Sequence, residues 1–326
     1  MKRLALLWLM VLSAPAWADR VLTDQTGRTI TLAEPAQRVV STYTPSNLLA
    51  LSLGLADRLV GVGGKTDQTG LSAALLAGHQ PVPVGSRSRG VSLETLVSLK
   101  PDLVLVYGKQ DGLRLADKLA ASGIPALVIQ PETMVSLKAD LDLLGRATGQ
   151  EAEAARVITA IEQVEHRLQQ GLAGLTPAQR QRGYYATDAD PLRTASGQMF
   201  QSELMTLAGL TNIAATTRGF FPKVSLEQLY RWQPQLLVLD QGRSGQVADL
   251  TPLGPLAALP QVQLPTASDW NMPSPVAVNA ALWMAAHAYP ERFDPAQARA
   301  QIGQFYQTVY GRACFSPLSE APCLPQ

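Results

Sequence analysis

The chain of 326 residues contains few of the residues on which catalysis and metal binding usually depend. It has only three histidines, His79, His166 and His287, and they lie far apart in the sequence. A zinc or manganese site needs several such ligands at close spacing, so direct binding of a metal ion is disfavoured. G-x-S-x-G and H-E-x-x-H motifs are both lacking, and residues 61–65 do not have the spacing of a phosphate-binding loop. We therefore predict no catalytic residues, no cofactor and no resident metal.

Charge and cysteine are also scarce. Charged residues make up 16% of the chain and the formal net charge is +1, which disfavours nucleic acid and anionic membrane surfaces as partners. The only two cysteines, Cys314 and Cys323, lie in a tail rich in proline and serine. In an oxidising compartment we expect them to form a disulfide that closes a small loop. Two free thiols that bind a metal are the weaker alternative, because no histidine or third cysteine lies nearby.

Long apolar runs are limited to the N-terminus, where residues 1–18 are typical of a cleaved signal peptide. Lys2 and Arg3 precede an apolar segment at 4–12, and Ala16-Trp17-Ala18 is a small-x-small cleavage site. The apolar segment is too short to span a bilayer. We therefore expect a soluble mature protein that begins at Asp19 and lies outside the cytoplasm.

Two similar stretches, residues 91–106 and 224–239, dominate the remaining sequence. VSLETLVSLKPDLVLV and VSLEQLYRWQPQLLVL align without a gap and share seven of sixteen residues. Each has a serine that can cap a short helix, a proline where the helix must stop, and an apolar run typical of a strand covered on both faces. Because the copies are 133 residues apart, they indicate two similarly built lobes and not a solenoid.

The rest of the chain alternates short apolar strands with helices, which predicts an α/β fold with parallel sheets. Residues 151–170 carry apolar residues at helical spacing, and a helix of that length can run from one lobe to the other. No flexible Gly/Ser linker is present. We predict two Rossmann-like lobes joined by a long rigid α-helix, with a ligand cleft between them: an N-terminal lobe at 19–132, a helical linker at 133–175, and a C-terminal lobe at 176–326 that includes the cysteine-containing tail.

Candidate ligand-binding residues follow from the rule that ligands bind at the carboxyl ends of parallel strands. Polar, basic and aromatic residues gather at these positions, and they suit a bulky planar or anionic ligand through stacking and bidentate pairing. The same aromatic residues could instead pack in the core, the serines and threonines could cap helices, and the two arginines at 87 and 89 are equally typical of a solvated loop. The candidates are Tyr43, Thr44, Lys65, Arg87, Arg89, Tyr107, Arg218, Phe220, Trp270 and Ser274.

The order of these features resembles one family. A signal peptide, a short hairpin, S-L-E at 92–94 followed by K-P-D-L-V-L at 100–105, a long bridging helix and a second copy of the unit are similar to the class III, helical-backbone periplasmic substrate-binding proteins of ABC importers for iron-siderophore complexes, haem and cobalamin. The resemblance covers nearly the whole mature chain.

This resemblance implies a receptor without enzymatic activity that delivers a metal chelate to an ABC permease dimer and its ATPase. It also implies that one exposed glutamate per lobe, Glu94 and Glu227, docks onto arginines of the permease. The alternative is that both glutamates only complement their helix dipoles.

Several other functions remain open. The same transport role could serve molybdate or tungstate. An α/β enzyme with an inter-domain site would need an unrecognised acid/base pair, for instance Asp188 with Lys65. A third hypothesis is a sensory module that presents bound ligand to a membrane receptor.

Overall fold

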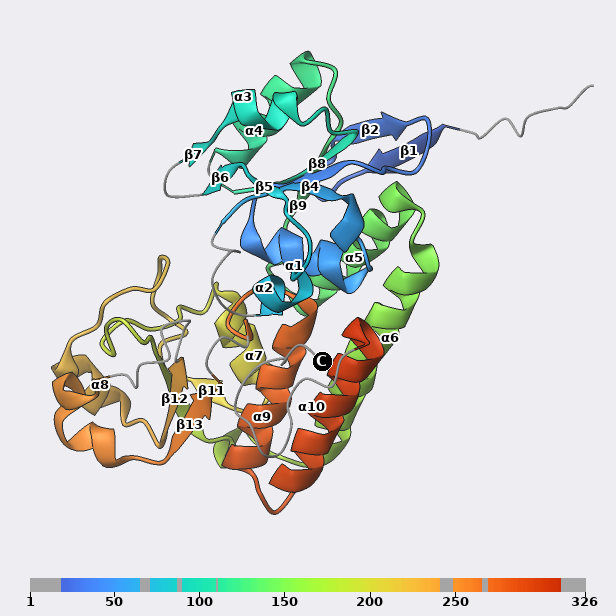
Figure 1. The fold of residues 1–326 in the computed structure, drawn as a ribbon. Helices are drawn as coiled ribbons and strands as arrows, with labels where there is room; N and C mark the ends of the chain where they lie inside the picture. The colour runs from blue at the N-terminus through green and yellow to red at the C-terminus, as the bar shows by residue number, and fades with distance from the viewer. Residues whose placement is uncertain are drawn as a thin grey trace, which may run out of the picture.

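The computed structural model describes residues 19–64, 71–86, 90–109, 111–240, 249–265 and 269–311. They form two α/β lobes stacked one above the other (Figure 1). Within these residues no helix combines the length and the apolar character needed to cross a bilayer. Several predicted features lie outside the described residues: the signal peptide at 1–18, Lys65, Arg87, Arg89, Cys314 and Cys323.

The N-lobe is built on a five-stranded parallel sheet with the order β5-β4-β3-β8-β9. Its buried strands are continuous apolar runs, as expected where helices cover both faces. The strands are β3 (Val39–Ser41), β4 (Leu59–Val62), β5 (Val82–Pro83), β8 (Leu103–Tyr107) and β9 (Ala126–Ile129). The helices are α1 (Thr44–Ser52), η1 (Ala56–Arg58), α2 (Leu71–Leu75), α3 (Leu93–Ser98) and α4 (Gly112–Ala121). Two antiparallel pairs complete the lobe, β1 (Arg20–Thr23) with β2 (Thr29–Leu32) and β6 (Gly85–Ser86) with β7 (Gly90–Val91).

Polar residues at 43–47 would be typical of a loop, but most of them belong to the first turn of α1. The helix begins at Thr44, and Pro45 occupies its first turn, where the missing N–H of proline costs nothing. The polar residues Thr44, Ser46 and Asn47 are consequently buried in the first turn and do not line an open loop.

The C-lobe repeats this plan with a smaller parallel sheet of order β11-β10-β12-β13. Its strands are β10 (Arg182–Ala186), β11 (Thr211–Asn212), β12 (Leu236–Asp240) and β13 (Gln261–Leu264). Its helices are η2 (Pro177–Gln179), α7 (Phe200–Leu207), α8 (Leu226–Trp232), η3 (Thr251–Ala258), η4 (Pro275–Ala277), α9 (Val278–Ala288) and α10 (Pro295–Tyr310).

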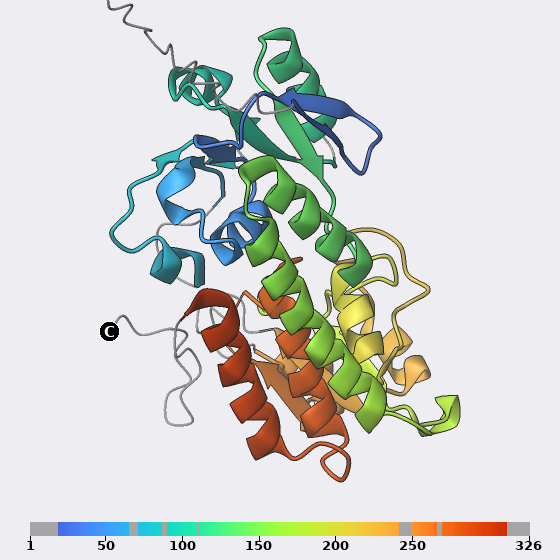
Figure 2. The ribbon, with the colours of Figure 1, turned by 90° about the vertical axis from the view of Figure 1, so that its right-hand side faces the viewer.

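Two helices connect the lobes, α5 (Met134–Thr148) and α6 (Glu151–Gly171). Gly149, in the left-handed conformation, ends α5 and allows the chain to turn directly into α6. Helix α6 packs on α5 near the N-lobe and on α9 and α10 of the C-lobe, and Figure 2 shows this course in green. Apolar side chains of α6 belong to a core cluster that extends through both lobes. The predicted bridging helix is therefore present, and it is held by packing along its length.

The two duplicated stretches adopt the same local structure. Ser92 caps α3 by accepting a hydrogen bond from Thr95 N (3.2 Å), and Ser225 caps α8 by accepting one from Gln228 N (3.1 Å). Each helix then runs through a proline-containing turn into a central buried strand, β8 in one lobe and β12 in the other. The sequence identity between the two stretches therefore corresponds to equivalent positions in the two lobes.

Candidate functional site

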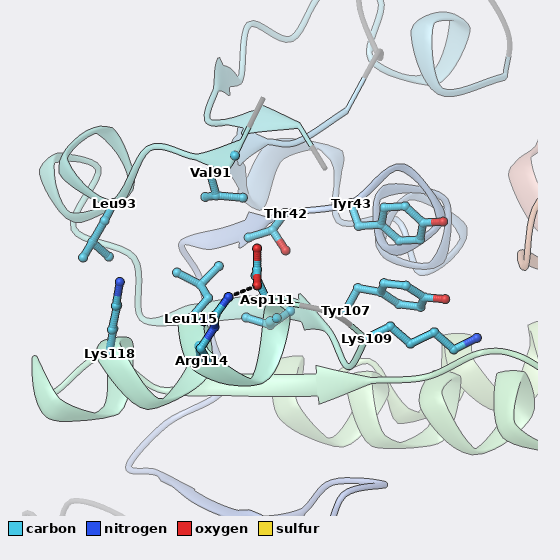
Figure 3. A pocket seen from close by; sticks show the side chains of 13 residues that line it. Thr42, Tyr43, Val91, Leu93, Tyr107, Lys109, Asp111, Arg114, Leu115 and Lys118 are labelled. Atoms are coloured by element: carbon cyan, nitrogen blue, oxygen red, sulfur yellow. Dashed lines mark hydrogen bonds and ion pairs between the residues drawn. The ribbon is translucent and has the colours of Figure 1, made fainter. Parts of the chain in front are cut away.

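Two tyrosines meet at the carboxyl edge of the N-lobe sheet. Tyr43 directly precedes α1 after β3, and Tyr107 ends the neighbouring strand β8. Because β3 and β8 are adjacent and parallel, their ends place the two half-buried rings together, with centroids 4.4 Å apart and planes 22° apart. This is a stacked aromatic pair, whose rings point in the same direction in Figure 3. Both residues were predicted site residues, and the structure brings them together.

Glu132, in the loop after β9, holds the polar end of this pair. Its carboxylate accepts a hydrogen bond from the Tyr107 hydroxyl and forms an ion pair with Lys109 Nζ at 2.6 Å. Lys109 Nζ also lies 5.9 Å from the centroid of the Tyr107 ring. Glu132 and Lys109 were not among the predicted site residues, although Lys109 lies just after the end of β8, the same feature that led to the prediction of Tyr107.

A cavity of about 470 Å³ opens beside the tyrosine pair, between α4 and the segment from β7 to α3 (Figure 3). Its floor is apolar, with Val91, Leu93, Val106 and Leu115, and its rim carries three cationic side chains and one acidic side chain. The acid, Asp111, is paired with Arg114. The charged rim residues are Lys109, Asp111, Arg114 and Lys118.

The approach of α4 to β8 depends on a glycine. A Cβ atom on Gly112 would lie 1.8 Å from the carbonyl oxygen of Tyr107, a distance that no side chain can accept. Glycine at this position therefore allows α4 to start directly at the strand end and to form one wall of the cavity.

The carboxyl edge of the C-lobe sheet carries a hydrogen-bonded polar chain. Asp240, the last residue of β12, accepts hydrogen bonds from the Tyr185 hydroxyl (2.7 Å) and from Asn271 Nδ2 (2.9 Å). Burial, followed by the negative charge of Asp240, raises the pKa of Tyr185 well above its ordinary value. The Tyr185 hydroxyl therefore stays protonated at neutral pH and donates a hydrogen bond to Asp240. Asp240 occupies the position equivalent to Tyr107 in the duplicated unit.

The predicted site residues of the C-lobe lie in different environments. Arg218 and Phe220 are exposed in the loop before α8, and the Phe220 ring is 66% exposed and packs edge-on against Phe221 at 4.7 Å. Phe221 in turn stacks on Tyr185 at 6.3 Å, so this aromatic loop is anchored on the end of β10. Arg218 and Phe220 are thus accessible to a ligand.

The prediction that Trp270 stacks on a ligand is wrong for this structure. The side chain is completely buried, its Nε1 donates to the Tyr306 hydroxyl at 2.8 Å, and its ring packs edge-on against Trp283. The prolines that follow Trp270 lead into η4. Trp270 is a core residue of the C-lobe.

Two of the predicted hydroxyl residues are also buried. Ser274 is completely buried at the start of η4, and its Oγ has no hydrogen-bond partner in the described part of the chain. Thr44 is 8% exposed in the first turn of α1 and lies close to Gly64. Neither side chain is accessible to a ligand, because both are buried at the start of their helices, Thr44 in α1 and Ser274 before η4.

The two candidate docking residues are placed alike. Glu94 on α3 and Glu227 on α8 are both exposed, each in the first turn of its helix. Within the described ranges, no group of three or more histidine, cysteine, aspartate or glutamate residues could hold a metal ion. The candidate site residues therefore comprise aromatic rings, cations and hydrogen-bonding groups at the strand ends of the two lobes.

Comparison with known proteins identifies the family of this chain. Residues 39–250 match the family model described as periplasmic binding protein. The chain belongs to the periplasmic binding protein family. A vitamin B12-binding protein of Yersinia pestis is 31% identical over 249 residues, which cover 74% of this chain and 83% of that protein.

Solved structures share the fold of this periplasmic binding protein. A molybdate periplasmic binding protein of Haemophilus influenzae superposes with a TM-score of 0.76 at 22% identity, over 90% of this chain and 99% of that one. The periplasmic vitamin B12-binding protein of Vibrio cholerae superposes with a TM-score of 0.64 at 22% identity, over 78% and 98%. The expected two-lobed α/β fold and the expected family are therefore confirmed.

Proposed function

We propose that this periplasmic binding protein captures a metal chelate with an extended planar face, a corrinoid in the first instance, for an ABC importer. The observation that carries the proposal is the stacked pair Tyr43–Tyr107 beside a cavity of about 470 Å³. Two parallel rings fixed at a sheet edge offer a rigid aromatic surface, which binds a large flat ligand at low entropic cost. The similarity to a vitamin B12-binding protein supports the choice of a corrinoid.

The size and the charge of the cavity agree with this class of ligand. Its volume is in the range of small-molecule sites, so it accommodates one arm of a corrinoid while the ring lies outside, over the tyrosines. Of the three cationic side chains that line it, Lys109 is paired with Glu132 and Arg114 with Asp111, whereas Lys118 has no ion pair in the described part of the chain. Lys118 therefore favours an arm that carries negative charge, such as a phosphate. In the C-lobe, the exposed ring of Phe220 is a candidate for contact with the opposite face of the ligand.

The role in transport follows from the same proposal. The protein has no enzymatic activity, acts in the periplasm as a monomer, and delivers its ligand to a permease dimer through Glu94 and Glu227. Two exposed anions at a fixed separation would orient the receptor and steer its association with a cationic surface.

Isothermal titration calorimetry of the mature protein tests the ligand. The titrants are cyanocobalamin, haemin, a ferric hydroxamate siderophore, and molybdate. We expect cyanocobalamin to bind, and we expect Tyr43→Ala to weaken binding about 10- to 100-fold, because a stacked ring contributes about 1–3 kcal/mol. Tyr43→Phe keeps the ring and should retain most of the affinity, and Tyr230→Ala removes an exposed ring on α8 and should leave it unchanged.

Other results would change the assignment in specific ways. Binding of haemin or the ferric siderophore alone would keep the chelate class and reject the corrinoid. Binding of molybdate alone, unaffected by Tyr43→Ala, would refute the aromatic site and assign an oxyanion receptor.

A further inference from the structure

Both docking helices expose a large apolar side chain at the same position of the duplicated unit. Val97 on α3 is 42% exposed and Tyr230 on α8 is 44% exposed. The two are equivalent in the alignment of the stretches, and each lies three residues after the exposed glutamate of its helix. Only seven large apolar side chains are exposed within the described residues, and two of them occupy these matched positions.

The spacing places each apolar side chain beside its glutamate. Residues three apart on a helix are surface neighbours, so Glu94 adjoins Val97 and Glu227 adjoins Tyr230. The opposite face of each helix is anchored in its lobe by an equivalent buried leucine, Leu96 or Leu229. Each lobe therefore presents one acidic and one apolar group side by side, directed away from its core.

Equivalent contacts hold the two helices rigidly. At the C-terminal end of α3, Arg38 donates to the carbonyl oxygens of Leu99 (2.7 Å) and Lys100 (3.1 Å). At the end of α8, Arg182 donates to the carbonyl oxygens of Trp232 and, at 3.3 Å, Gln233.

The residues that end the two helices also match in backbone conformation. Lys100 and Gln233 occupy equivalent positions, and both have the unusual φ of 47°. The paired surfaces are therefore preorganised, and Figure 1 shows their helices on separate lobes, both away from α6.

One charged residue makes the two surfaces different. Arg231 on α8 forms an ion pair with Glu227, whereas the equivalent residue on α3 is Ser98. Glu94 has no ion pair within the described part of the chain. A cation on the partner would meet an unneutralised acid on the N-lobe but would compete with Arg231 on the C-lobe.

We propose that each lobe docks through a composite contact, in which the glutamate meets a cation of the permease and the adjacent side chain, Val97 or Tyr230, enters an apolar recess beside that cation. Arg231 weakens the C-lobe contact by occupying Glu227. This inference rests on the proposed function, because it takes the partner to be a permease dimer with two equivalent docking places. Exposed charges supply orientation and association rate, while a buried apolar side chain supplies affinity, so the two groups have complementary roles.

The test measures binding of the mature protein to the permease–ATPase complex of the same organism, purified in lipid nanodiscs, by surface plasmon resonance. Tyr230→Ser should weaken binding about 10-fold or more, chiefly through faster dissociation, and Val97→Ser about threefold. Val135→Ser is the matched control, because it removes a valine that is 75% exposed on α5, outside both docking helices. Arg231→Ser, which makes the C-lobe surface like that of the N-lobe, should tighten binding about two- to fivefold at low salt, with a smaller effect at high salt.

Each outcome separates this inference from the proposed function on which it rests. Wild-type protein that binds its ligand but not the complex would overturn the transport role itself. If Glu94→Gln and Glu227→Gln weaken docking while Tyr230→Ser and Val97→Ser behave like Val135→Ser, docking stands and the apolar half of the contact is refuted. Weaker binding of Arg231→Ser would show that Arg231 contacts the permease, which overturns its assignment as a neutralising residue.

Discussion

A buried carboxyl group on α5, Asp140, should make the stability of the protein depend on pH. The side chain is completely buried, its Oδ2 accepts a hydrogen bond from Gln130 N at 3.0 Å, and its Oδ1 has no partner within the described residues. Burial raises the pKa of Asp140 to about 8, and the negative charge of nearby Asp24 adds to this effect. The folded protein therefore keeps Asp140 protonated at neutral pH.

The sign of the pH dependence follows from the two pKa values. In the unfolded chain an aspartate titrates near pH 3.9, so between about pH 4 and pH 8 the folded state binds one proton more than the unfolded state. Raising the pH therefore favours unfolding, by about 1.4 kcal/mol per pH unit at most, and the loss ends above the folded pKa. Between pH 5 and pH 8 the total is at most about 4 kcal/mol, a large part of the stability of an ordinary domain.

Asp140→Asn should remove this loss of folding stability at rising pH. The amide is uncharged and nearly isosteric, and its oxygen can still accept the hydrogen bond from Gln130 N. In urea unfolding followed by circular dichroism, the variant should gain stability relative to wild type as the pH rises from 5 to 8. The control, Asp142→Asn, makes the same change on the exposed side of α5 and should alter the unfolding free energy by less than about 0.5 kcal/mol at every pH. Parallel curves for wild type and Asp140→Asn would refute the reasoning.

Three further substitutions test the assignment of structural residues. Trp270→Phe removes the hydrogen bond to Tyr306 and leaves a void, so calorimetry should show that the free energy of unfolding falls by about 2–4 kcal/mol, while the ligand affinity of the folded protein is unchanged. A loss of affinity without a loss of stability would show instead that Trp270 contacts the ligand. Tyr289→Phe deletes a hydroxyl that donates to Gly209 O and accepts from Gln181 N, both at 2.8 Å, and should cost about 1–3 kcal/mol in urea unfolding; a neutral effect would contradict this pairing. Gly112→Ala should lower both the melting temperature and the affinity for the ligand, because the added methyl group forces α4 away from Tyr107; unaltered values for both would show that the wall of the cavity does not depend on this glycine.

The organisation of the chain was predictable because it depends on patterns that are local in sequence. The apolar spacing of residues 151–170 predicted a bridging helix, and α6 occupies 151–171. The duplicated stretches predicted capped helices that lead into buried strands, and both were found. Tyr43 and Tyr107 were selected by the strand-end rule alone, which holds because parallel strands bring their carboxyl ends to one edge.

The environment of individual side chains was not predictable in the same way. Trp270 and Phe220 both lie near prolines and polar residues, yet one is completely buried and the other is 66% exposed. The Trp270 ring packs against Trp283 of α9, and Tyr306 of α10 accepts a hydrogen bond from its indole. No property of the sequence around residue 270 encodes that contact, since Tyr306 lies 36 residues further along the chain.

The sequence by itself determined the fold class, the two lobes, the family and the strand ends that carry the candidate site, because periodicity, capping and duplication act over a few residues. The tertiary structure decided which of those side chains are accessible and which groups surround them. It joined Glu132 to Tyr107 across two strands, buried Asp140 and so raised its pKa, and exposed Val97 and Tyr230 beside the two glutamates. These outcomes depend on burial and on contacts between distant segments, and only packing of the whole chain sets them.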